Sequence, residues 1–209
     1  MSNNLITIVD YGCGNIYSLN RILEKLDCKV QITDDPEKVS KADKIILPGV
    51  GAYSIGMENL KKNDLIQALN VFLKKGNSLL GICLGMQLLM KSSQEFGNHE
   101  GLGLINGKVI SLDKNENFPI PHIGWSQINI ELSKNSLISN IKDKSYFYFI
   151  HSFKVIVENE IDTVCNTEYG INNFCSVVNH QNIFGTQFHP EKSGKVGEKL
   201  IQNFLNLKI

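Results

Sequence analysis

The chain has 209 residues, of which 42% are hydrophobic, and its 21 basic residues balance its 21 acidic ones. This length and composition suffice for one domain with an ordinary core, so we expect residues 1–209 to form a single domain. A formal net charge of zero excludes a broad field that would recruit nucleic acid or an anionic membrane, and we expect neither as a partner.

The sequence also argues against export, membrane insertion and metal binding. Its N-terminus lacks the basic region and small-residue cleavage site of a secretory signal. The apolar run from Leu79 to Met90 is too short to span a bilayer. The five cysteines include no Cys-x-x-Cys pair, which disfavours a disulfide framework and a zinc site. We therefore expect a cytoplasmic protein without a metal.

The first half of the chain alternates strand and helix patterns. Strands are predicted over Leu5–Val9, Lys29–Thr33, Lys44–Leu47 and Ser78–Ile82, and helices near Ile16–Leu26 and through the periodic apolar positions between Leu60 and Leu73. Such alternation predicts a parallel sheet built from right-handed crossover units.

The second half is dominated by strand patterns and closes with a helix. Strands are predicted over Lys108–Leu112, Ser126–Glu131, Tyr146–Ile150, Phe153–Val157, Thr163–Glu168, Phe174–Asn179 and Ile183–Gln187, and the last helix begins near Gly194. Several of these strands should pair antiparallel, with a hairpin turn over Asn179–Asn182. The predicted fold class is therefore α/β, with a central, mostly parallel sheet flanked by helices and an added antiparallel β portion in the second half.

One segment, Leu79–Gln87, reads as a buried strand that turns abruptly at Cys83 and continues as a helix. Gly81 and Gly85 leave room for the tight turn that exposes the serine of G-x-S-x-G hydrolases. Cys83 takes the place of that serine, and the N-terminus of the following helix favours its thiolate form. Cys83 is the predicted nucleophile.

A base and a carboxylate follow another predicted strand. His189 can activate the thiol, and Glu191 can fix the tautomer of the histidine if it reaches the far ring nitrogen. Taken alone, Cys83 would be read as a buried thiol, His189 as a polar residue at a strand end and Glu191 as a helix cap. Their joint occurrence favours the catalytic interpretation. His122 and His151 are second choices for the base, each better explained as structural.

The loop after the third strand is a candidate oxyanion hole. Gly49, Val50 and Gly51 can bring backbone N–H groups close to a ligand, and the N–H of Leu84 is a further donor. Tyr11–Asn15, after the first strand, resembles a phosphate loop, but Tyr17 stands where G-x-G-x-x-G needs its third glycine. We interpret that segment as a tight structural turn.

The segments Gly81–Gln87 and His189–Glu191 resemble the class I glutamine amidotransferases. Further motifs narrow the resemblance to the glutaminase subunits of imidazole glycerol phosphate synthase, and it extends over essentially the whole chain. These motifs are Tyr11–Asn15, Leu47–Gly51, Gly101–Ile105, Pro121–Trp125, Ile150–Ser152 and Gln187–Ser193.

The resemblance implies a flavodoxin-like fold and a glutaminase mechanism. Cys83 would attack the side-chain amide of L-glutamine to give a glutamyl thioester and ammonia, and no cofactor is implied. The residues implied to bind the amino-acid portion of glutamine are Gln87, Glu95, Ser152 and Phe153.

The resemblance also implies a partner. Such subunits form a heterodimer with a (β/α)₈ cyclase, which uses the ammonia to make imidazole glycerol phosphate and an aminoimidazole ribonucleotide. His122, Trp125 and Tyr148 would lie at the joint face or ammonia channel. Family members are nearly silent until the partner binds substrate, so the Pro48–Gly51 loop should have to reorient.

Two positions depart from the pattern of the family, and other segments leave alternative functions open. Phe153 and Ser126 stand where family members usually have tyrosine and asparagine. Phe147–Phe149 and Glu168–Ile171 are similar to a paralogous branch that supplies ammonia for amidination of surface-polysaccharide sugars. A stand-alone cysteine hydrolase and a catalytically silent α/β binding module are the readings from other classes.

Overall fold

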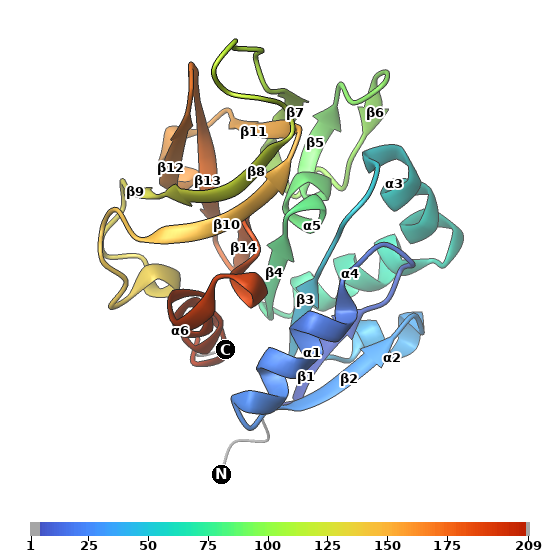
Figure 1. Ribbon diagram of the computed structural model, residues 1–209. Coiled ribbons are helices and arrows are strands. Elements are labelled where there is room, and N and C mark those ends of the chain that lie inside the picture. The colour runs from blue at the N-terminus through green and yellow to red at the C-terminus, as the bar shows by residue number, and fades with distance from the viewer. Residues whose placement is uncertain (1–4, 208–209) are drawn as a thin grey trace.

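A computed structural model describes residues 5–207 of the chain (Figure 1). Its main sheet has twelve strands, and its first part is parallel. In sheet order these parallel strands are β2 (Lys29–Thr33), β1 (Leu5–Val9), β3 (Lys44–Leu47), β4 (Ser78–Ile82) and β14 (Ile183–Thr186). No helix within residues 5–207 is long and apolar enough to cross a membrane.

The sheet continues beyond β14 into the second half of the chain, where most pairs are antiparallel. The strands of this extension are β13 (Asn172–His180), β11 (Phe153–Val157), β7 (Ile105–Ser111), β5 (Met90–Ser93), β6 (His99–Glu100), β12 (Thr163–Tyr169) and β9 (Asn129–Ile130). Within it, β5 pairs parallel with β7. The predicted fold class is confirmed, and its two parts share one hydrogen-bonded sheet.

Two further strands, β8 (His122–Gln127) and β10 (Tyr146–His151), form an antiparallel ribbon of their own. The ribbon crosses in front of the extension in Figure 1. Its inner side chains Phe147 and Phe149 are fully buried and belong to a core shared with α1 and α6. The ribbon is therefore fixed to the sheet by apolar packing on one face.

Helices cover both faces of the parallel strands, because consecutive strand residues alternate between two apolar cores. Ile8, for example, packs in the core with α1 and α6, and its neighbour Val9 packs in the core with α2, α3 and α4. The helices are α1 (Ile16–Lys25), α2 (Pro36–Ser40), α3 (Tyr53–Lys62), α4 (Leu65–Lys74), α5 (Leu84–Leu88) and α6 (Gly194–Leu205). Short 3₁₀ turns span Ser136–Ile138, Glu160–Asp162 and Pro190–Lys192.

Three sequence predictions need correction. The helical periodicity between Leu60 and Leu73 belongs to two helices, because Asp64 adopts a left-handed conformation with φ 55° and turns the chain. The strand predicted over Ser126–Glu131 is instead the end of β8 followed by the short β9, so the Pro121–Trp125 motif is itself largely strand. The helix after Cys83 has only five residues and leads directly into β5, a strand that the apolar run concealed.

The contact between α6 and the Pro190–Lys192 turn gives a prediction about stability. An added Cβ at Gly197 would lie 1.9 Å from the carbonyl oxygen of Pro190, so helix and turn meet backbone to backbone. Gly197→Ala, which usually stabilises a helix interior, should here lower the free energy of unfolding by about 1–3 kcal/mol. Urea unfolding would measure this, with Lys195→Ala on the exposed side of α6 as the control. A stabilised Gly197→Ala protein would contradict the packing.

Candidate active site

Three loops meet at one edge of the parallel sheet. They follow β3, β4 and β14, which are neighbours in the sheet and run in the same direction. Carboxyl ends of adjacent parallel strands lie side by side, so Pro48–Gly51, Cys83 and Gln187–Glu191 come together. The predicted nucleophile, base and oxyanion loop therefore share one site.

Cys83 is held in a strained conformation at the end of β4. Its backbone angles, φ 54° and ψ −109°, are rarely adopted by residues other than glycine. The turn persists because its surroundings are tight: an added Cβ at Gly85 would lie 1.9 Å from the carbonyl oxygen of Leu47, and one at Gly81 would lie 2.7 Å from the Gly85 backbone. The N–H of Cys83 also donates to the carbonyl of Thr186 over 2.7 Å. This is the geometry of a nucleophile elbow.

His189 and Glu191 form a buried pair beside the thiol. The Nδ1–H of His189 donates to Oε1 of Glu191 over 2.7 Å, because a carboxylate can only accept. Nε2 of His189 is buried and hydrogen-bonds no group within residues 5–207. Burial lowers the pKa of His189, but its interactions with Cys83 and Glu191 outweigh burial and raise this pKa from 6.5 to about 10. The histidine is therefore set to hold a proton next to the nucleophile.

The candidate oxyanion loop is in a blocked arrangement. The N–H of Leu84, a predicted donor, points at the carbonyl oxygen of Gly49 at 3.3 Å. The preceding carbonyl, that of Pro48, accepts the hydroxyl of Tyr11 over 2.7 Å. Tyr11 also packs against the loop, since an added Cβ at Gly49 would lie 2.5 Å from its hydroxyl oxygen. As it stands, the loop presents an acceptor where a developing oxyanion needs donors.

A cavity of about 420 Å³ opens beside Cys83, within the size range of small-molecule sites. It brings together nearly all of the predicted oxyanion and substrate residues. Its lining comprises Val50, Gly51, Cys83, Leu84, Gln87, Glu95, Phe96, Ile150, His151, Ser152 and Phe153. A larger hollow of about 540 Å³ lies among β9, β11, β12 and β13, away from the nucleophile.

Two of the predicted substrate residues are held by the protein itself. Nε2 of Gln87 donates to the carbonyl of Phe153 over 3.2 Å and to Oε1 of Gln187 over 3.1 Å. Oε2 of Glu95 accepts the N–H of Tyr53 over 2.7 Å. Burial raises the pKa of Glu95, against the opposing effect of the Tyr53 N–H. Both side chains are thus pre-positioned at the cavity wall.

His122 and His151 occupy an interior position. Nδ1–H of His151 donates to the carbonyl of Phe153 over 2.8 Å, so its Nε2 accepts from Nδ1–H of His122 at 3.0 Å. Nε2 of His122 is then left to accept the Ser126 hydroxyl at 2.8 Å. Burial lowers the pKa of His122 to about 4 and that of His151 to about 3. Both rings are therefore neutral links in a hydrogen-bonded chain, which fits a structural role.

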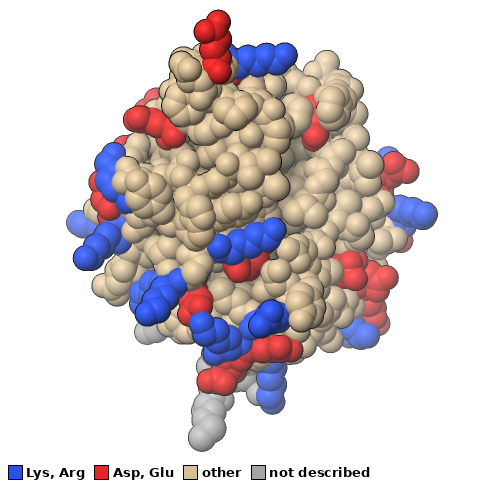
Figure 2. Space-filling model, viewed as in Figure 1, with Lys and Arg blue, Asp and Glu red and all other residues tan. Residues whose placement is uncertain are grey.

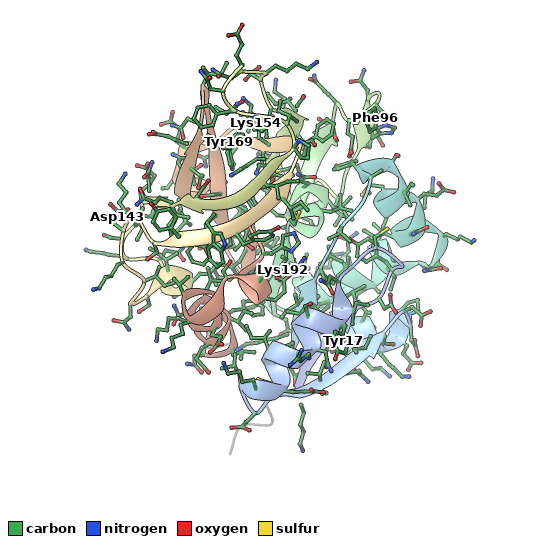
Figure 3. All side chains as sticks on the ribbon, viewed as in Figure 1. Tyr17, Phe96, Asp143, Lys154, Tyr169 and Lys192 are labelled. Atoms are coloured by element: carbon green, nitrogen blue, oxygen red, sulfur yellow. The ribbon has the colours of Figure 1, made fainter. Side chains whose placement is uncertain are left out.

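The outer face of the β8–β10 ribbon is apolar and exposed. Trp125 is 54% exposed and meets Tyr148 edge to face, with ring centroids 6.0 Å apart. Nζ of Lys192, a residue labelled in Figure 3, lies 6.0 Å from the centre of the Tyr148 ring. Ile123 and Ile150 extend the same face, which is uncharged over much of the upper half of Figure 2. We call Ile123, Trp125, Tyr148 and Ile150 the ribbon face.

His122, which the sequence analysis grouped with Trp125 and Tyr148, does not lie on the ribbon face. It is 1% exposed and stacks between Phe149 and Tyr169 on the inner side of β8. Strand alternation separates it from Trp125, since side chains three residues apart point to opposite faces.

Sequence reasoning missed three residues of the site. Tyr11 was assigned to a structural turn, and its tyrosine hydroxyl gave no signal of a contact 37 residues away. Gln187 was taken as the end of a strand, although its Nε2 lies 3.8 Å from the Cys83 sulfur. Phe96 follows Glu95 in a polar stretch and was not considered, although it lines the cavity.

Comparisons with known proteins agree with this geometry. Residues 7–207 match the family described as glutamine amidotransferase class-I. The imidazole glycerol phosphate synthase subunit HisH 2 of Methanococcus maripaludis is 47% identical over 96% of this chain and 98% of the relative. The subunit HisH of Sulfurimonas denitrificans is 43% identical over 96% and 97%, and HisH 1 of Legionella pneumophila is 39% identical over 97% and 99%.

Solved structures share the fold at lower identity. The structure of PurLQS from Thermotoga maritima superposes with a TM-score of 0.74 at 20% identity, covering 97% of both chains. The glutaminase domain of Trypanosoma brucei CTPS, with bound acivicin, has a TM-score of 0.67 at 15% identity and covers 98% of this chain and 95% of that one. The chain therefore belongs to the class I glutamine amidotransferase family and, within it, to the family of these HisH subunits.

Proposed function

We propose that this chain is the glutaminase subunit of imidazole glycerol phosphate synthase, which supplies ammonia from L-glutamine to a (β/α)₈ cyclase in histidine biosynthesis. We further propose that residues 1–209 form one domain and act in the cytoplasm, where the five free cysteines stay reduced. The observation that carries the proposal is Cys83 on a strained elbow beside the buried His189–Glu191 pair.

The reaction begins with attack of the Cys83 thiolate on the carboxamide carbon of glutamine. His189 holds the proton of the thiol and delivers it from Nε2 to the departing nitrogen, so ammonia leaves and a glutamyl thioester remains. Water then attacks the thioester carbonyl while His189 takes its proton. The collapse of that adduct breaks the C–S bond, releases glutamate and restores the thiolate. Glu191 keeps the ring oriented and stabilises its charge throughout.

The blocked loop accounts for a resting subunit with low activity. The Gly49 carbonyl occupies the Leu84 N–H, so this donor is withheld from the oxyanion until the Gly49–Val50 peptide turns. One oxyanion donor is worth about 2.7–4 kcal/mol, or roughly 10²–10³ in rate. We propose that docking of the cyclase on the ribbon face favours the turned loop.

The ribbon face lies where docking of the cyclase can affect the catalytic residues. The carbonyl of Tyr148 accepts the N–H of His189 over 2.9 Å, and the N–H of Tyr148 donates to Oγ of Ser193. A partner that contacts the outer face of β10 therefore touches the backbone that holds the catalytic base. It would also cover the cavity, which Ile150 lines, and shelter the ammonia from water.

The relatives described above do not favour the alternative functions. Each is named as an imidazole glycerol phosphate synthase subunit, and none as a sugar-amidating protein. A silent binding module would have no need of a buried His–Glu pair or of a strained residue at the elbow.

Substitution of the nucleophile and base tests the proposal directly. Cys83→Ala should abolish glutamate release by the complex, and His189→Ala should lower it by about 10²–10⁴-fold, because the proton transfers are lost. The double variant should be no worse than Cys83→Ala, since the two side chains act as one unit. His180→Ala, on a partly exposed histidine outside the cavity, is the control. Retained activity in Cys83→Ala would exclude the mechanism.

The raised pKa of His189 gives a prediction about pH. The protonated ring is the acid that releases ammonia, so kcat/KM should fall as pH rises through about 10. Glu191→Gln removes a carboxylate that raises this pKa, so the alkaline limb should move to lower pH. Rate profiles of the two proteins from pH 6 to 10.5 would measure the shift. An unmoved limb would show that Glu191 does not stabilise the imidazolium.

A further inference from the structure

Phe96 is exposed and strained in a way that packing does not explain. Its side chain is 89% exposed, and its φ of 51° lies in the left-handed region that bulky residues avoid. It sits in the turn between β5 and β6, at the edge of the molecule in Figure 3. Such a conformation costs about 1–3 kcal/mol in a bulky residue, and residues of this kind cluster at active sites and ligand clamps.

The ring of Phe96 belongs to the wall of the cavity beside Cys83. It meets the ring of Phe153 edge to face, with centroids 6.0 Å apart. Phe96 comes from the β5–β6 turn and Phe153 from the start of β11, and the two rings together form an aromatic rim on the cavity. Their π faces carry partial negative charge and attract cations.

A carboxylate lies next to this rim. Glu95 is the one acidic side chain among the described residues that line the cavity, and it is 7% exposed. Oε2 of Glu95 accepts the Tyr53 N–H, and this bond and the nearby His99 favour the charged carboxylate, but burial outweighs both and raises the pKa of Glu95. A cation bound between Glu95 and the two rings would offset that effect of burial on the carboxylate.

The proposed substrate offers such a cation. The carboxamide carbon of glutamine must lie at Cys83, so the α-amino end extends into the rest of the cavity. Resting on the proposed function, we infer that Phe96 is a specificity residue, whose ring, with Phe153 and Glu95, recognises the α-ammonium group of a free amino acid. The site then selects glutamine over amides that lack this group.

The test measures ligand affinity in the full chain carrying Cys83→Ala, which prevents turnover. Calorimetry would compare L-glutamine with 4-carbamoylbutanoate, which is glutamine without its α-amino group. Phe96→Ala should weaken glutamine binding between about twofold and thirtyfold, the range of a cation–π contact, and change the binding of 4-carbamoylbutanoate less than twofold. Phe96→Tyr should restore glutamine affinity, and Phe96→Leu, which is apolar but not aromatic, should not.

Phe118→Ala is the matched control. Phe118 is also an exposed phenylalanine in an edge-to-face pair, with Tyr169 at 5.1 Å, but it lies outside the cavity. Its substitution should leave the affinity for both ligands unchanged.

Four results would overturn the inference. Equal losses for the two ligands, or rescue by Phe96→Leu, would show that the ring acts by apolar contact alone. Unchanged glutamine affinity together with weaker binding of the cyclase would make Phe96 a partner contact. If the Cys83→Ala parent binds no glutamine at all, the proposed function itself fails, and this outcome differs from the other three.

Discussion

The left-handed backbone of Cys83 is the constraint on which the site depends. At this residue the chain leaves β4 and begins α5 without an intervening loop, so the side chain projects from the edge of the sheet. Only glycine fits at positions 81 and 85, because backbone atoms of α5 and of the β3 loop occupy the space of a side chain. The same close packing brings the oxyanion loop against the first turn of α5. Nucleophile and oxyanion donors are therefore placed by one contact.

The contact between the oxyanion loop and the first turn of α5 also accounts for a resting, inactive form in the proposed mechanism. The Leu84 N–H is satisfied by the Gly49 carbonyl in the absence of substrate, which spares the protein an unpaired buried donor. Catalysis needs this pairing to be exchanged for one with the substrate oxygen. The Tyr11 hydroxyl holds the Pro48 carbonyl, so the exchange can be confined to the Gly49–Val50 peptide. In the proposed mechanism, this small local motion separates the resting subunit from the active one.

The sequence predicted those parts of the molecule that have a local pattern. Short buried strands before Pro48, Cys83 and His189 were recognisable, and the sheet then necessarily brings these residues together. The pairing of β13 with both β11 and β12, and the separate β8–β10 ribbon, depend on contacts between distant segments that leave no local signal.

Contacts between distant segments also decide how the site residues are arranged. His122 and Trp125 are three residues apart in one motif, but only the strand register shows that they face opposite sides. The roles of Tyr11, Gln187 and Phe96 depend on partners 37, 104 and 57 residues away. The Gly49 carbonyl points at the Leu84 N–H because of the orientation of a single peptide group. Composition and motif spacing do not determine that orientation.

The central claim is that a resting glutaminase is released by its partner. The most direct measurement is glutamate release by the purified chain alone, with the cyclase subunit of its organism, and with the cyclase plus its ribonucleotide substrate. We expect a low rate for the chain alone and a rise on the order of 10²–10³ in the full system, the value of one restored oxyanion donor. A high rate from the isolated chain, unchanged by cyclase and ribonucleotide, would contradict it.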